Sequence, residues 1–164
     1  MPITPTSPEA IAAIEVRNLI ASAATFIAAT GSANFTEAKN RVYIVERLPE
    51  TPGSSTEYVR PFALVLMPVF SFLTSRCGIP EGAISAMLEF EALPTDSPED
   101  SLIKAANFFG GVKSEVSQLG SPVAAVVNDA ALRFSRVSQQ GPYVRVRDTG
   151  KHDYWIVRWI IQLN

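Results

Sequence analysis

The side chains most often used in nucleophilic and metal-dependent chemistry are scarce in this sequence. It contains one histidine, His152, and one cysteine, Cys77, far apart in the chain. A Ser or Cys nucleophile usually needs an imidazole or another base beside it, and a zinc ion needs three or four nitrogen, sulfur or carboxylate ligands. The sequence therefore predicts no nucleophilic catalysis, no metal site and no bound cofactor.

Carboxylates are the next candidates for chemistry. Glu89 and Glu91 are two residues apart in an alternating segment, so both lie on one side of the predicted strand and could form an acid–base pair. A plain solvated strand face has the same spacing, and we favour that interpretation. Asp96, Glu99 and Asp100 follow closely and complete the densest acidic cluster in the chain, although Glu99 and Asp100 would also complement the dipole at the start of a helix.

The aromatic and basic residues near the C-terminus allow two further interpretations. Trp155 and Trp159 would share one face of a strand, where aromatic residues more often form a core or a subunit interface than a ligand platform. Arg145 and Arg147 would share a strand face, and Arg158 lies on another strand. A small basic patch is conceivable there, but solvated side chains are the interpretation we favour.

Composition limits the classes of function. The chain has 164 residues, of which 47% are hydrophobic and 18% charged, with a net charge of −2. This suits one folded domain over residues 1–164 with part of its apolar surface buried between subunits. The absence of a basic stripe argues against gripping DNA, although a weakly acidic protein could lie beside DNA without sticking to it. The sequence shows neither a signal peptide nor an apolar run of membrane-spanning length, so we expect a cytoplasmic protein without membrane contact.

Hydrophobic spacing predicts the elements that position these residues. Ser7 and Pro8 begin a long helix that ends at Gly31, and Ser97 and Pro98 begin a second one, with a possible bend at Gly110-Gly111. The state of residues 121–127 is undecided. The order predicts an α+β fold, in which a mostly antiparallel sheet of about five strands packs against two main helices. The clearest predicted strands are 42–48, 62–67, 83–93 and 154–163.

The layout of the whole chain resembles the tail terminator and tail-completion proteins of tailed bacteriophages. The resemblance is carried by the capped first helix and by Arg41-Val42-Tyr43, Pro61-Phe62-Ala63-Leu64-Val65, Gly141-Pro142-Tyr143-Val144-Arg145, and Asp153-Tyr154-Trp155 with Trp159. It implies a hexameric ring that stops tail-tube polymerisation, contacts the tail tube and the neck or connector, and lets DNA pass as a non-specific neighbour. It also implies a protein of the virion, assembled in the cytoplasm of the bacterial host.

Other roles remain open. Within phages the alternatives are a neck or head–tail connector protein, a tail tube protein and a capsid decoration protein. Outside them, the chain could be a small-molecule-binding or enzymatic α+β domain with a pocket between helix and sheet.

If the chain forms a ring, two sets of residues are candidates for its contacts. Loops with Pro, Gly, Tyr and Arg can present rigid anchors, which predicts subunit or partner contacts at Tyr58, Arg60, Gly141, Pro142, Tyr143, Arg145 and Arg147. The wall facing DNA should be neutral or acidic, because strong phosphate contacts would resist sliding. The candidate lumen residues are Glu89, Glu91, Asp96, Glu99 and Asp100.

Overall fold

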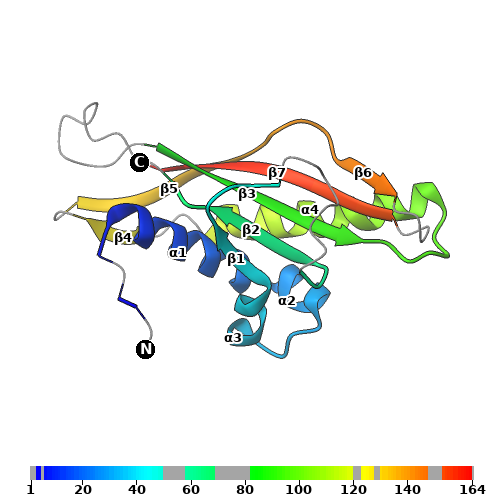
Figure 1. Cartoon of the computed structure of the whole chain (residues 1–164), viewed down its shortest axis with the longest axis horizontal. Helices are drawn as coiled ribbons and strands as arrows, with labels where there is room; N and C mark the ends of the chain where they lie inside the picture. The colour runs from blue at the N-terminus through cyan, green and yellow to red at the C-terminus, as the bar shows by residue number, and fades with distance from the viewer. Residues whose placement is uncertain are drawn as a thin grey trace.

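The computed structural model describes residues 3–4, 6–49, 58–68, 82–119, 123–127, 130–147 and 153–163. It confirms the α+β fold: one mixed sheet packs against helices that lie along it (Figure 1). The helices are α1 (Pro8–Ser22), α2 (Ala24–Thr30), α3 (Phe35–Ala38), which runs into a 3₁₀ turn (Lys39–Arg41), and α4 (Pro98–Leu119). The strands are β1 (Val42–Val45), β2 (Phe62–Leu66), β3 (Gly82–Glu91), β4 (Val123–Val127), β5 (Ala130–Gln139), β6 (Val144–Arg147) and β7 (Asp153–Leu163).

The long N-terminal helix expected from the sequence is two helices. Its ends are as predicted, because the Ser7 hydroxyl accepts a hydrogen bond from the Ala10 N–H at 3.2 Å and Gly31 ends α2 with a left-handed φ of 67°. At Ala23, however, the backbone is extended, and α1 and α2 are bent by 72°. No single described helix is long and apolar enough to cross a membrane. The bent pair of α1 and α2 passes that test when the two helices are taken together, on length and composition alone.

A carboxylate from a distant helix stabilises the start of α2. Ala23 caps α2 with no side-chain hydrogen bond, and Glu115 of α4 takes over this function. Its carboxylate accepts hydrogen bonds from the Thr25 backbone N–H at 3.0 Å and from the Thr25 hydroxyl at 2.9 Å. The break at Ala23 thus depends on a tertiary contact ninety residues away in the chain, which the hydrophobic spacing of the N-terminal segment could not reveal.

The glycine pair in α4 allows this approach and does not interrupt the helix, which is continuous from Pro98 to Leu119. A Cβ added at Gly111 would lie 2.8 Å from the Thr25 hydroxyl oxygen, too close for an unshifted contact. A Cβ at Gly110 would meet nothing within 4 Å. Gly111 is therefore the position at which α4 must lack a side chain so that α2 can pack against it.

These two glycines provide a matched pair for a test. We expect Gly110→Ala to raise the free energy of unfolding by about 0.5–1 kcal/mol, because alanine is the better helix former. Gly111→Ala has the same propensity gain but forces Thr25 away from Glu115, so we expect a net loss of about 1–3 kcal/mol. Urea titration monitored by circular dichroism measures both, and equal effects of the two substitutions would contradict the packing described here.

The last strand of the chain is central in the sheet. The order is β1-β2-β3-β7-β5-β4, and β6 also pairs with β7. Strand β7 pairs with β3 along its whole length, from Glu91 opposite Tyr154 to Gly82 opposite Leu163. On its other side β5 and β6 follow one another. Among the described strands, β1 and β2 form the one parallel pair. The sheet has seven strands where about five were expected, and the undecided segment contributes β4.

The core lies between the sheet and the helices. We call this side of the sheet the helix face; it buries Trp155 and Trp159 with apolar residues of α1, α2 and α4, so both tryptophans are core residues. The opposite side, the outer face, has a smaller cluster formed by Phe62, Leu64, Met87 and Ile156. The sheet is therefore covered on both faces near its centre, as expected for the uninterrupted apolar run of β2.

Candidate functional site

The turn before β6 is exposed, but its tyrosine is not a free anchor. Gly141 has a left-handed φ of 72°, and both it and Pro142 are exposed, as a contact loop requires. The ring of Tyr143 lies 5.2 Å from the ring of Phe109 in α4 and packs against the helix-face core. Of the predicted contact residues in this turn, Gly141 and Pro142 remain available, whereas Tyr143 contributes to the fold.

Arg145 and Arg147 are paired within the chain. Both lie on the helix face of β6, beside Asp153 at the start of β7. Arg145 binds one carboxylate oxygen of Asp153 at 2.6 Å, and the Arg147 Nε binds the other at 3.0 Å. Hydrogen bonds from Arg145 and then Arg147 hold the pKa of Asp153 below its ordinary value. Two arginines and one aspartate leave the β6 edge of the sheet with a net positive charge. Arg158, which the sequence allows to form a basic patch with these arginines, donates to the Pro49 carbonyl at 3.0 Å instead.

The Asp153 pairs should make stability depend on pH. Because the folded-state pKa is lowered, the stabilisation is complete above the ordinary value of 3.8 and is lost as pH falls through the folded-state pKa. We expect Asp153→Asn to lower the free energy of unfolding by about 1 kcal/mol at pH 7. The difference from the unsubstituted chain should vanish at strongly acidic pH, measured by urea titration at successive pH values. A pH-independent difference would contradict the pairing.

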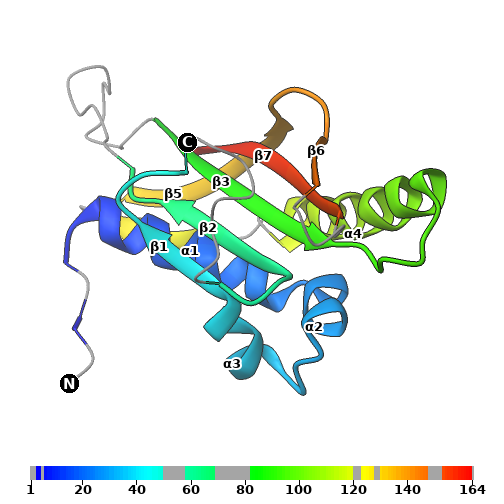
Figure 2. The same cartoon turned by 45° about the vertical axis from the view of Figure 1, so that its right-hand side comes forward.

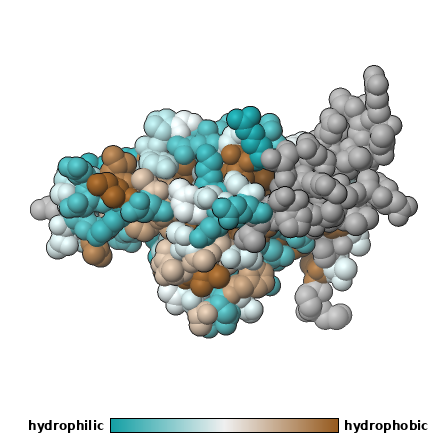
Figure 3. Space-filling model, turned by 180° about the vertical axis from the view of Figure 1, so that it is seen from behind, coloured by the Kyte–Doolittle hydropathy of each residue, from teal (hydrophilic) through white to brown (hydrophobic). Residues whose placement is uncertain are grey.

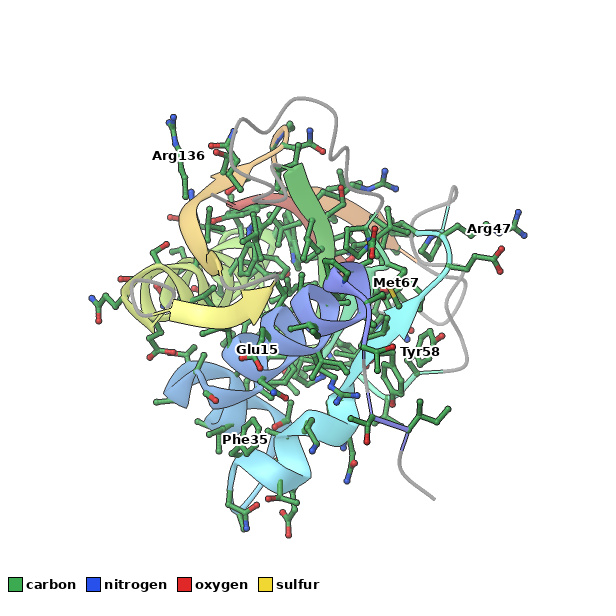
Figure 4. The ribbon with its side chains drawn as sticks, turned by 90° about the vertical axis from the view of Figure 1, so that its left-hand side faces the viewer. Glu15, Phe35, Arg47, Tyr58, Met67 and Arg136 are labelled. Atoms are coloured by element: carbon green, nitrogen blue, oxygen red, sulfur yellow. The ribbon has the colours of Figure 1, made fainter. Side chains whose placement is uncertain are left out.

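Tyr58 and Arg60, the other predicted contact residues, pack on the outer face. The Tyr58 ring lies 4.3 Å from the ring of Tyr43 and 5.0 Å from that of Phe62, and Figure 4 shows it beside β1. The Arg60 guanidinium lies 3.8 Å from the Tyr154 ring centroid. Its side chain is 10% exposed. Both residues are thus occupied inside the subunit, and neither projects as an interface anchor.

Glu89 is buried, which corrects its interpretation as a solvated or lumenal residue. Its side chain is fully buried and pairs with Arg60, whose Nε and terminal nitrogen both bind Oε1, at 3.0 and 2.9 Å. The other oxygen, Oε2, is buried without a hydrogen-bond partner among the described residues. Burial raises the pKa of Glu89, and the charge and hydrogen bond of Arg60 oppose that rise. The alternation around Glu89 is as predicted, but the second face is covered by the segment that precedes β2.

The remaining acidic candidates differ in their availability. Glu91 and Glu99 are exposed. Asp96 accepts hydrogen bonds from the Leu93 N–H at 3.0 Å and from Lys104 at 2.6 Å, so its charge is paired. Asp100 is exposed and bonds with Ser97, whose hydroxyl accepts from the Asp100 N–H at 3.1 Å and caps α4. The structure does not bring the five carboxylates together on one surface, because Glu89 lies on the buried part of the outer face.

An apolar surface that the sequence did not reveal lies where α4 begins. Leu93, Leu102 and Ile103 are 62%, 43% and 50% exposed, and we call them the α4-start patch. Figure 3 shows apolar side chains at this end of the molecule, on the left of the view. The apolar character of Leu102 and Ile103 and their position in the helix are typical of core residues, but Ser101 and Ala105 are buried at this point of α4 instead. Ser101 is drawn inward because its hydroxyl accepts a 2.6 Å hydrogen bond from the Trp155 indole N–H.

Candidate metal ligands do not gather in the described part of the chain, where no group of three or more His, Cys, Asp or Glu side chains is placed to hold an ion. Cys77 and His152 lie outside the described residues, as does most of the Pro49–Arg60 loop. Comparison with models of known protein families gives no match, and comparison with curated proteins finds none similar in sequence. What the chain does must therefore be argued from its own surface.

Proposed function

We propose that this chain is a self-assembling structural subunit that forms a ring at the head-proximal end of a phage tail. There it ends tail-tube polymerisation and joins the tail to the neck. The observation that carries the proposal is the α4-start patch, because three large apolar side chains are exposed close together in the chain at one end of the molecule.

A subunit contact gives this patch a physical role. Clustered apolar side chains at a protein surface mark interaction sites more often than isolated ones do. Burying each of these side chains would contribute about 1 kcal/mol or more, at roughly 25 cal/mol per Å² of apolar area. The charged residues beside the patch, Glu99, Asp100 and Lys104, would form the polar rim typical of an interface.

The proposal also includes DNA as a passing neighbour. Glu91 and Glu99 are exposed near the α4-start patch, and Asp153 offsets one of the two positive charges of Arg145 and Arg147. A lumen wall lined by Glu91 and Glu99 would repel phosphate weakly and would not bind it strongly enough to resist sliding. The proposed location is the virion, after assembly in the host cytoplasm.

Tail-tube length tests this function. Tube subunits are polymerised with and without the purified chain, and tube lengths are measured by negative-stain electron microscopy. We expect the chain to bind tube ends and to stop elongation. Ile103→Lys should remain folded but lose this effect, because it places a charge in the α4-start patch. Asn107→Lys, one turn later on the exposed side of the same helix, is the matched control. Tubes that grow equally long with and without the chain would refute the proposal.

A further inference from the structure

Three described strands lie at edges of the sheet: β1, β4 and β6. Two of them, β1 and β6, have four residues each. In the described part of the chain β1 forms ladder hydrogen bonds with β2 alone, and β6 forms them with β7 alone. Figure 2 shows them on opposite sides of the sheet. An edge strand with an open backbone is a template for another strand, and proteins either protect such edges or use them for pairing. Val144, at the start of β6, is 42% exposed, so this edge carries an uncovered apolar side chain.

We infer that β6 of one copy pairs antiparallel with β1 of a neighbouring copy, so that one sheet continues from subunit to subunit. The inference rests on the proposed function as a ring subunit and names the strands through which the ring closes. Contacts between two different edges are heterologous, and heterologous contacts close into rings or extend into filaments.

Charge favours β1 over a second β6 as the partner of β6. If β6 paired antiparallel with β6 of another copy, Arg145 and Arg147 would lie opposite arginines on the same face, and like charges directly opposite are unfavourable. Strand β1 has no charged side chain and lies between Arg41 and the exposed Glu46 and Arg47. Continued alternation would place Glu46 on the helix face with Ile44, and Arg41 and Arg47 on the outer face. On the helix face, which carries Arg145 and Arg147, the charge next to β1 is thus the complementary carboxylate of Glu46.

The faces of the two strands limit the pairing to registers that differ by two residues, and the contact between Arg145 and Glu46 selects one of them. Val45 and Val146 both pack against the outer-face cluster, while Ile44 packs against the helix-face core and Arg145 pairs with Trp155 on that same face. Placing Val146 opposite Val45 keeps the faces aligned across the junction. It also puts Arg145 opposite Glu46, and Arg147 opposite Ile44. A shift by one residue would turn every side chain to the wrong face.

Cysteine cross-linking tests this register in the full chain. The single native cysteine is first removed as Cys77→Ser. Val146→Cys and Val45→Cys are then combined, because directly opposite Cα atoms of an antiparallel pair lie about 4.5–5.5 Å apart, within the Cα separation that a disulfide spans. The matched control combines Val144→Cys with Val45→Cys, a diagonal pair at about 7–8 Å that cannot be bridged without backbone movement. Each variant is checked by circular dichroism, oxidised gently and analysed on a non-reducing gel.

We expect a ladder of covalent multimers for Val146→Cys with Val45→Cys and none for the control pair. Native mass spectrometry of the uncross-linked chain tests the ring assembly separately from the β1–β6 pairing. If the chain forms multimers but Val146→Cys with Val45→Cys gives no cross-link, the β1–β6 pairing is wrong and the proposed ring can still hold. If the chain neither multimerises nor binds tail tubes, the proposed ring is wrong as well. A dimer from Val45→Cys alone would show that two β1 edges pair, and would also overturn the inference.

A surface substitution gives an independent readout. Glu46→Arg replaces an exposed carboxylate with a charge that repels Arg145 of the neighbour. We expect it to weaken assembly about two- to fivefold per contact at low salt, and less at high salt. Glu46→Gln should lie between this variant and the unsubstituted chain. Sedimentation velocity over a concentration series measures the shift, and an unchanged assembly equilibrium for Glu46→Arg would contradict the pairing.

Discussion

Replacing Arg60 with alanine should lower the free energy of unfolding by about 3–5 kcal/mol, because it leaves the buried Glu89 carboxylate without its partner. The Glu89 side chain is fully buried, and within the described part of the chain its Oε1 pairs with Arg60. Substitution also removes the guanidinium that lies 3.8 Å from the Tyr154 ring centroid. Urea unfolding monitored by tryptophan fluorescence measures the loss.

Arg47→Ala is the matched control, because Figure 4 shows Arg47 pointing away from the protein and its side chain is exposed. We expect that substitution to change stability by less than about 0.5 kcal/mol. Replacing both members of the pair, as Arg60→Met with Glu89→Leu, should recover much of the stability. If Arg60→Ala were as mild as Arg47→Ala, Arg60 would be free for a partner, as the sequence alone had suggested.

The pKa of Glu89 adds a pH dependence of defined sign. Its folded-state pKa is raised above the ordinary 4.5, so the folded chain holds this proton at pH values where the unfolded chain has lost it. The Glu89 contribution to the free energy of unfolding therefore falls as pH rises from about 4.5 through the folded-state pKa. This is opposite to the effect of Asp153, whose pairs stabilise the fold above its ordinary pKa.

Replacing Trp159 with alanine should cost about 3–5 kcal/mol, since it removes the largest fully buried side chain and leaves a cavity beneath the helices. Calorimetric or urea unfolding measures the loss. Trp159→Phe should cost less, because the indole nitrogen of Trp159 has no hydrogen-bond partner among the described residues. Trp155→Phe should be the more damaging of the two Phe substitutions, because it also leaves the Ser101 hydroxyl without its 2.6 Å donor. Near-normal stability of Trp159→Ala would contradict the assignment of Trp159 to the core and would favour the alternative that the two tryptophans bind a ligand.

Local signals were sufficient for the element types. Residues close together in the sequence determine the helix caps at Ser7 and Ser97, the apolar run of β2 and the alternation of β3 and β7. The order of these elements predicts the α+β fold. The start of α2 after the break at Ala23 and the need for glycine at position 111 involve contacts between Thr25 and α4, which are far apart in the chain. Periodicity within a single segment cannot report such a contact.

The candidate contact residues were harder to predict for the same reason. Tyr and Arg are frequent in interfaces, but they are also suited to packing inside a subunit, as Tyr58, Arg60 and Tyr143 do. Glu89 lies on the face of β3 that the alternation predicts. Whether that face is exposed to solvent depends on the segment that packs over it, which the alternation within β3 cannot show. The exposure of Leu102 and Ile103 could not be predicted from spacing, because adjacent apolar positions can also share the buried stripe of a helix, as Phe108 and Phe109 do in α4.

The copy number of the assembled chain tests the central claim most directly. Native mass spectrometry and sedimentation velocity are run on the purified chain over a range of concentrations, and negative-stain electron microscopy is run on tail tubes incubated with it. We predict a closed hexamer, either free in solution or seated on the tube end. A monomer at every concentration that also leaves tail tubes unbound would contradict the account.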